Sequence, residues 1–225
     1  MNFLQLTQRL QLECGVSGSP IVTVVNQTGE FARLVTWINA AWIDIQNKHE
    51  DWEWLRTSTT WPTVAGQYKY TLAQCNTSNF GMWHRGTFRN YDTAAGINSE
   101  IFMEYEVFDI WRDKYLYGAL RDTRSRPFVA SVGPDKSIYL GPVVTSGYTM
   151  EADYYTAPTE LALDADTPAL PTRFHMAIVY RAMISYGMYE SASEVVQRGT
   201  SEYRKLLSQI EADRLPEMLV GSALA

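Results

Sequence analysis

Residues 28–46 read TGEFARLVTWINAAWIDIQ, and a WEW triplet follows at residues 52–54. Apolar side chains recur every three or four positions along the longer stretch, which is the spacing of one face of an α-helix. The members of this stripe are Phe31, Leu34, Val35, Ile38, Trp42 and Ile45, with Trp37 and Ala41 widening it. A stripe this broad predicts a helix that packs against more than one neighbour. The WEW triplet alternates apolar and polar residues, which predicts a change to β structure.

Helical patterns also occupy both ends of the chain. They cover about residues 2–14, 171–190 and 191–215, each with apolar residues at helical spacing. Because these segments lie on either side of a long middle region, we expect residues 1–50 and 171–225 to pack together as one helical base.

The middle region, residues 51–170, reads mainly as short strands with one internal helix near residues 105–115. A hairpin is predicted between Trp54–Trp61 and Gln67–Leu72. The turn GPDK at residues 133–136 predicts a second one. The other strand candidates are Gly86–Tyr91, Glu100–Glu104, Pro127–Val132, Ser137–Leu140 and Tyr148–Ala157.

The predicted fold class is therefore α+β. A helical bundle built from both chain ends would carry an inserted antiparallel β module, folded as a small sandwich or barrel-like sheet.

The composition is that of an acidic, aromatic-rich globular protein. Of the 225 residues, 46% are hydrophobic and 13% aromatic, and 19 basic residues stand against 25 acidic ones, for a formal net charge of −6. A protein that binds nucleic acid regardless of sequence needs many Lys and Arg to neutralise phosphates, which argues against that class. The aromatic content indicates broad packed interfaces as well as a core.

Signals for export, membrane insertion or a disulfide scaffold are missing from the sequence. The first residues, MNFLQ, lack the basic and apolar regions of a signal peptide. No apolar run approaches the ~18 residues that a membrane span needs. Cys14 and Cys75 are too few for a disulfide framework, so we expect free thiols. We therefore expect a soluble protein, made in a cytoplasm, with no membrane partner.

No set of residues forms a pattern typical of catalysis, cofactor binding or metal binding. The sequence contains no Walker loop, no dinucleotide fingerprint and no nucleophile elbow. His49, His84 and His175 lack partners at metal-ligand spacing. Carboxylates gather at residues 104–113, where a glycosidase-like pair is the alternative to a solvated helix face. We expect no enzyme activity, no cofactor and no metal.

Two groups of residues allow more than one interpretation. The run RDTRSR at residues 121–126 has three arginines and one aspartate, and suits a solvated loop, a contact with a subunit or partner, or a DNA phosphate. Aromatic residues gather between positions 52 and 91 and suit either a sugar-binding platform or core and subunit packing. They are Trp52, Trp54, Trp61, Tyr68, Tyr70, Trp83, Phe88 and Tyr91.

The helix quoted first also carries a family resemblance. The groups TGE, RLV, WIN and AWIDIQ within residues 28–46, followed by WEWLR at residues 52–56, resemble the head–tail connector, or adaptor, proteins of tailed bacteriophages. In that family a helix of this kind leads into a W-x-W-x-R strand and a hairpin. The similarity covers about residues 1–72, and the two closing helices also resemble those of the family.

This resemblance implies a structural virion protein at the head–tail junction. Adaptors of this kind form a ring, usually of twelve copies, which docks beneath the portal of the DNA-filled capsid, extends the channel for genome ejection and receives the next tail component. DNA would pass through without specific binding, which suits a net negative chain. The alternatives are a tail-completion or neck protein, and a carbohydrate-binding module that uses exposed Trp and Tyr.

Two sets of residues are predicted to contact partners. The apolar tail after Pro216 cannot cover a core of its own, and four of its residues are predicted to dock on the portal: Met218, Leu219, Val220 and Leu224. A second set is predicted to contact neighbouring subunits or a tail protein: Trp37, Trp42, Arg121, Arg124 and Arg126.

Overall fold

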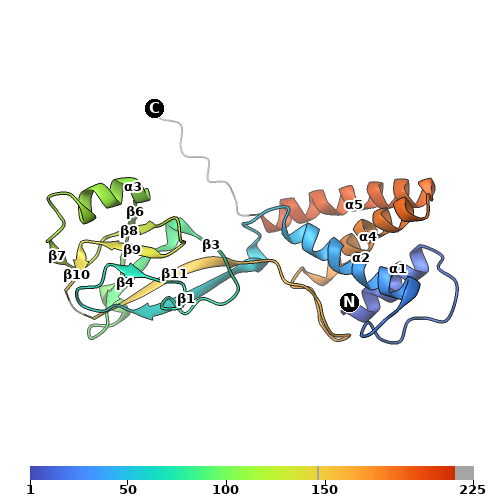
Figure 1. Ribbon diagram of the computed structural model, residues 1–225, viewed down its shortest axis with the longest axis horizontal. Helices are drawn as coiled ribbons and strands as arrows, with labels where there is room; N and C mark the ends of the chain where they lie inside the picture. Colours follow the sequence, from blue (N-terminus) through green and yellow to red (C-terminus); the bar gives the residue numbers. More distant parts are fainter. Residues whose placement is uncertain (146, 216–225) are drawn as a thin grey trace, which may run out of the picture. The chain divides into compact units, whose positions relative to one another are not determined.

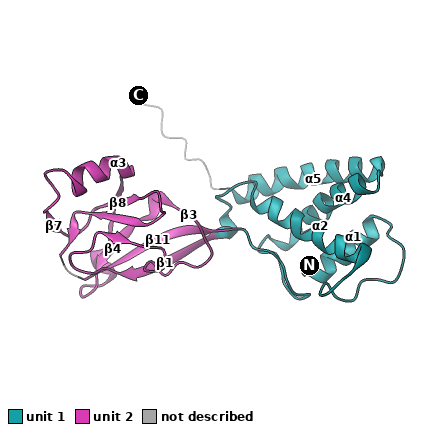
Figure 2. Cartoon of the chain, in the orientation of Figure 1, with its two compact units in different colours: residues 1–55, 158–225 teal, residues 56–157 magenta. Residues whose placement is uncertain are grey.

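The computed structural model describes residues 1–145 and 147–215, and it divides the chain into two compact units (Figure 2). Unit 1 comprises Met1–Leu55 and Pro158–Ala225, and unit 2 comprises Arg56–Ala157. The division falls five residues after the sequence-based boundary at residue 50 and thirteen residues before the one at residue 171. The second difference arises because the returning chain after Pro158 packs with the helices instead of the strands.

Unit 1 is a bundle of four helices, drawn in blue and orange-red in Figure 1. The helices are α1 (Phe3–Glu13), α2 (Gly29–Gln46), α4 (Met176–Tyr189) and α5 (Ser193–Arg214). The α4 helix packs against each of the other three, and it is apolar on most of its surface, as a central helix must be. The predicted positions of all four helices are confirmed within a few residues.

The first helix begins and ends at residues that the sequence marks. Asn2 and Gln5 form a reciprocal capping box, in which each side chain accepts a hydrogen bond from the other residue's backbone N–H. The chain leaves the helix through Gly15, whose φ of 66° is a left-handed conformation that glycine adopts without strain.

Two side-chain amides of α2 form paired hydrogen bonds with the backbone of the returning chain, one donated and one accepted by each amide, as a neighbouring strand does. Asn39 donates to Leu161 O and accepts from Leu161 N, both at 2.8 Å. Gln46 pairs with Thr159 in the same reciprocal way, at 3.0 and 3.1 Å. Both backbone groups of each residue are satisfied, so the irregular segment can lie against the helix without a desolvation penalty.

Unit 2 contains three sheets. The largest has the order β1 (Arg56–Pro62), β11 (Tyr148–Thr156), β4 (Arg89–Asp92) and β5 (Ile101–Phe102), and β3 (Phe80–Trp83) also pairs with β11. The second has the order β2 (Lys69–Tyr70), β9 (Ile138–Gly141), β8 (Val129–Val132) and β6 (Glu104–Tyr105). The third joins β10 (Val143–Val144) to β7 (Arg124–Ser125) in parallel.

One core lies between the two larger sheets, and its aromatic members include Trp61, Tyr70, Trp83 and Phe88. Both sheets contribute to it, which makes unit 2 a small sandwich, and within the described residues the sheets do not close into a barrel. The α+β class and the insertion between terminal helices are confirmed.

Irregular and helical turns connect the strands. The predicted internal helix is α3 (Phe108–Trp111), extended by a π turn at Arg112–Leu116. The 3₁₀ turns lie at Glu53–Leu55, Arg85–Thr87, Ile97–Ser99 and Thr172–Phe174.

The predicted hairpin between residues 54–61 and 67–72 is wrong. The strand that follows the WEW triplet is β1, and it pairs along its whole length with β11, about ninety residues later, from Arg56↔Tyr155 to Pro62↔Thr149. The β2 strand pairs with β9 instead. By contrast, β8 and β9 form the predicted hairpin around residues 133–136.

We predict that Gly199→Leu destabilises unit 1, because α4 and α5 approach closely at this residue. A Cβ at position 199 would lie 3.0 Å from Tyr180 O and 3.3 Å from Met183 Cβ. Overpacking of this kind costs roughly 1–3 kcal/mol, whereas the better helix propensity of leucine works in the opposite direction. Thermal unfolding followed by helical circular dichroism tests the effect. Gly86→Ala is the control, because nothing lies within 4 Å of its Cβ position, and an equal change in both variants would contradict the close packing.

Candidate interaction surfaces

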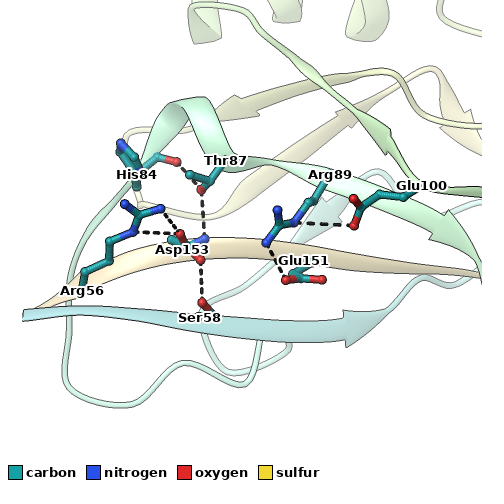
Figure 3. Close-up of polar contacts among 8 residues, drawn as sticks. All are labelled: Arg56, Ser58, His84, Thr87, Arg89, Glu100, Glu151 and Asp153. Atoms are coloured by element: carbon teal, nitrogen blue, oxygen red, sulfur yellow. Dashed lines mark hydrogen bonds and ion pairs between the residues drawn. The ribbon is translucent and has the colours of Figure 1, made fainter. Parts of the chain in front are cut away.

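The central strand of unit 2 separates an apolar face from a polar one. Alternate residues of β11, among them Met150, Ala152 and Tyr154, enter the core. Glu151 and Asp153 point to the opposite face, because successive side chains of a strand alternate. The pairing register places Ser58 opposite Asp153 and Arg89 opposite Glu151, so polar partners face each other across the strands (Figure 3).

Asp153 is the centre of this polar face and is only 5% exposed. Its carboxylate accepts hydrogen bonds from Ser58 Oγ at 2.6 Å and from Arg56 Nε at 2.8 Å, with a further bond from Arg56 Nη2. Its backbone N–H donates to Thr87 Oγ1 at 2.9 Å, and Thr87 in turn donates to His84 O at 2.7 Å. The carboxylate therefore ties β1 to β11, and its neighbouring backbone ties in the turn at residues 85–87.

Burial alone would raise the pKa of Asp153, but the hydrogen bonds from Ser58 and Arg56, with the positive charge of Arg56, outweigh it and hold the pKa below its usual value. The neighbouring Glu151 receives a hydrogen bond from Arg89 at 2.6 Å, and Arg89 also forms an ion pair with Glu100 at 3.7 Å (Figure 3). The carboxylates of Asp153 and Glu151 therefore accept hydrogen bonds that connect neighbouring strands of the sheet.

The three arginines of the RDTRSR run differ in their surroundings. Arg126 lies against the sheet and donates to Asn90 Oδ1 and Asn90 O, both at 2.8 Å, and to Ser99 O at 2.6 Å. Arg121 and Arg124 are exposed, and neither forms an ion pair with another described residue. Only Arg121 and Arg124 are therefore accessible for a partner, and Arg126 stabilises unit 2 internally.

The two tryptophans predicted to contact partners also differ. Trp42 is 1% exposed and belongs to the interior of unit 1, so in this fold its side chain packs the bundle instead of contacting a partner. Trp37 is half-buried and contacts the rings of Tyr186 and Tyr189, with ring centroids 5.8 and 5.6 Å apart. Met218, Leu219, Val220 and Leu224, which were predicted to dock on the portal, lie outside the described residues.

Exposed apolar side chains are frequent in one stretch of the sequence of unit 2. Of the fifteen large hydrophobic residues that are exposed within the described part of the chain, seven lie between residues 97 and 128: Ile97, Phe102, Val107, Ile110, Tyr117, Leu120 and Phe128. Such side chains are available for burial against a partner. The sequence did not reveal this, since core and surface hydrophobic residues look alike in short irregular segments.

The aromatic residues considered for a sugar platform lie mostly in the interior. Trp52, Trp61, Tyr70, Trp83 and Phe88 are all buried, so they cannot present rings to a glycan. Stacking holds Trp54 on Trp52, with ring centroids 4.3 Å apart, and Trp52 Nε1 donates to Ile45 O at 3.0 Å. The WEW triplet therefore anchors the chain to α2 before the strand begins.

His49, His175 and the two cysteines lie in surroundings that fit a structural role. His49 Nε2 lies 3.0 Å from a carboxylate oxygen of Glu211, and the buried His175 lies 2.8 Å from Leu170 O through Nε2. Cys14 and Cys75 are free, and burial raises the pKa of each thiol to about 12, which makes the reactive thiolate scarce at neutral pH.

The described part of the chain contains no group of three or more His, Cys, Asp or Glu residues able to hold a metal ion. Among the helices of residues 1–145 and 147–215, none has the length and apolar content that crossing a membrane requires.

Comparison with known protein families gives a match that covers residues of both units. The family model described as SU10 adaptor protein matches residues 1–221. The chain belongs to the SU10 adaptor family. This is a family of phage head–tail adaptors, so the resemblance noted in the sequence is confirmed. No curated protein matches the chain.

We predict that Asp153→Asn destabilises unit 2 of this adaptor by about 1.5–3 kcal/mol at pH 7, because it removes the charged hydrogen bonds that the buried carboxylate accepts from Ser58 and from Arg56, whose side chain is 45% exposed. The folded-state pKa of Asp153 lies below its unfolded value, so its stabilising contribution is complete above the unfolded pKa and is lost as the pH falls through the folded pKa. Denaturant unfolding at several pH values should therefore show the gap between wild type and variant closing below about pH 4.

Asp113→Asn is the matched control, because that carboxylate is 70% exposed and a surface pair of this kind contributes only about 0–1 kcal/mol. A gap between wild type and Asp153→Asn that persisted at low pH would contradict the ionic role of Asp153.

We predict opposite results for two neighbouring arginines of the adaptor. Arg126→Ala should lower the free energy of unfolding of unit 2 by roughly 1.5–3 kcal/mol, because it removes charged hydrogen bonds to partly buried acceptors. Arg124→Ala should leave the stability within about 0.5 kcal/mol of wild type. Chemical denaturation of both variants checks the pair, and equal stabilities would refute the distinction.

Proposed function

We propose that this adaptor is a structural, non-enzymatic virion protein that forms a ring of about twelve copies beneath the capsid portal. The ring would extend the DNA channel and receive the next tail or neck protein. It would be made in the host cytoplasm and incorporated at the head–tail junction. The observation that carries the proposal is the family match across residues 1–221, which includes both units and therefore applies to the whole adaptor.

The exposed surfaces support a protein that is surrounded by partners. Unit 2 presents seven large hydrophobic side chains between residues 97 and 128, and a virion protein can bury such surface against its neighbours. Arg121 and Arg124 add exposed positive charge in the same region. Arginine, tyrosine and other aromatic residues are enriched at protein interfaces.

The charge of the chain supports passage of DNA without specific binding. Each copy carries a formal charge of −6, and twelve copies would multiply it. A net negative ring disfavours lasting contacts with phosphates, so a genome could slide through it.

The proposal is tested by imaging the purified adaptor mixed with purified portal rings under negative stain. We expect a second ring stacked on the portal, coaxial with its channel. Binding to a later tail protein but not to the portal would favour the tail-completion or neck alternative. Binding of the monomer to a glycan array, without portal binding, would favour the carbohydrate-binding alternative.

We predict that deletion of residues 218–225 weakens portal binding by at least about tenfold. The segment contains four large or branched apolar residues, Met218, Leu219, Val220 and Leu224. They would provide most of the apolar surface that is buried when this C-terminal segment contacts the portal. A pull-down on immobilised portal measures the effect. Glu217→Gln with Ser222→Ala is the control, since it alters only polar groups within the deleted segment or directly before it. Unchanged binding after the deletion would assign the portal contact to another part of the chain.

A further inference from the structure

The segment that follows the π turn and runs to the first residue of β7, residues 117–124, offers both apolar and positive groups. We call it the basic loop. Tyr117 is 70% exposed and Leu120 is 41% exposed. Arg121 and Arg124 are also exposed and form no ion pair with the described residues. A loop with accessible rings and unpaired guanidinium groups has the composition of an interface hot spot.

A second surface, on unit 1, has the matching properties. The end of α4, the turn that follows it and the start of α5, residues 188–194, expose Met188 (68%) and Tyr189 (52%). Glu190 and Glu194 are exposed as well, and neither carboxylate forms an ion pair with a described residue. We call this surface the acidic corner.

A shallow hollow of about 360 Å³ opens at the acidic corner. Its lining consists of Gly187, Met188, Ser191, Ser193, Val196 and Gln197. Gly187 is required there, because a Cβ at this position would lie 2.7 Å from Val196 Cγ2. The hollow therefore offers room beside the turn for an apolar side chain of a partner.

The charges around the corner remain negative when the neighbouring helix is included. Arg33 of α2 lies over the Tyr189 ring, 4.5 Å from its centroid, and adds one positive charge. Glu30, in the first turn of the same helix, adds one negative charge. With Glu190 and Glu194 the local balance is two negative charges. In the basic loop, Arg121 and Arg124 stand against the exposed Asp122, which leaves one net positive charge, so the two surfaces carry opposite charge.

We propose that the basic loop of one copy binds the acidic corner of the next copy in the ring. The proposal rests on the ring proposed above and specifies one of its subunit contacts. Because the two surfaces differ and lie on different units, the contact is heterologous. Repeated around the assembly, a contact of this kind closes into a ring if the rotation allows it.

The distribution of charge between the units favours a second copy as the occupant. By sequence, unit 1 has nine Lys and Arg against fifteen Asp and Glu, and unit 2 has ten of each. The acidic surface that the arginines need is thus available on every copy of the chain. Electrostatic complementarity of this kind steers association and fixes which surfaces meet.

Charge reversal tests the contact directly. One variant carries Arg121→Glu with Arg124→Glu, and a second carries Glu190→Arg with Glu194→Arg. Each is mixed with portal rings, and native mass spectrometry counts the adaptor copies bound to each portal. We expect each variant alone to lose the complete ring, because like charges then face each other at every contact. Circular dichroism confirms that both variants fold.

Mixing the two variants in equal amounts should restore the ring. The reversed loop of the first variant then meets the reversed corner of the second, and the unchanged surfaces meet at the next contact, so the two alternate around a ring of even number. A single chain with all four substitutions should also form rings. Lys48→Glu with Arg204→Glu is the control of equal charge change, since both side chains are exposed and unpaired among the described residues, and it should assemble normally.

The outcomes separate the proposals. Rings formed by either variant alone would overturn the contact and leave the proposed function standing. Failure of both the mixture and the four-substitution chain would overturn it too, and would assign the basic loop to the portal, a tail protein or DNA. If wild-type protein forms no ring on the portal, the proposed function fails, and this contact fails with it.

Discussion

The antiparallel pairing of β1 with β11 is the constraint on which the rest of the structure depends. Seven consecutive residue pairs join the first strand of unit 2 to its last, from Arg56↔Tyr155 to Pro62↔Thr149. The chain therefore enters and leaves unit 2 on adjacent strands. Because the two ends of unit 2 are adjacent, an insertion of about a hundred residues can interrupt the helical bundle, and the helical segments before and after it can still pack together.

Hydrogen bonds fix this pairing on one face and apolar packing fixes it on the other. Asp153 binds Ser58 and Arg56 across the strands, while Trp61 and Met150 belong to the shared core. After β11 the chain meets α2, where Asn39 and Gln46 hold its backbone. The α4 helix can then pack against α1 and α2, which end 130 or more residues earlier, and α5 packs against α4.

The sequence predicted the parts of the fold that depend on local periodicity. The four long helices and the β8–β9 hairpin follow from apolar spacing and turn residues close in the chain. The partner of β1 could not be found in this way, because local signals favour the nearest strand and carry no information about a partner ninety residues later. The role of Asp153 was missed for the same reason, since its partners come from another strand.

Burial decided which predicted contact residues remain accessible. Trp37 and Trp42 belong to one helical stripe, and only the tertiary packing of unit 1 makes Trp42 interior and leaves Trp37 half-buried against Tyr186 and Tyr189 of α4. Likewise Arg124 and Arg126 have the same chemistry, yet the carbonyl groups of Asn90 and Ser99 bind only Arg126. Such differences depend on long-range backbone positions that composition and spacing do not encode.

We predict that this chain connects portal to tail. Cryo-electron microscopy of the neck of phage particles that contain it is the most direct measurement. The prediction is a continuous ring of copies around the DNA channel between the portal and the tail, with the end of α5 facing the portal. Particles in which the chain is absent from this position, or present only as isolated copies outside the channel, would contradict the account.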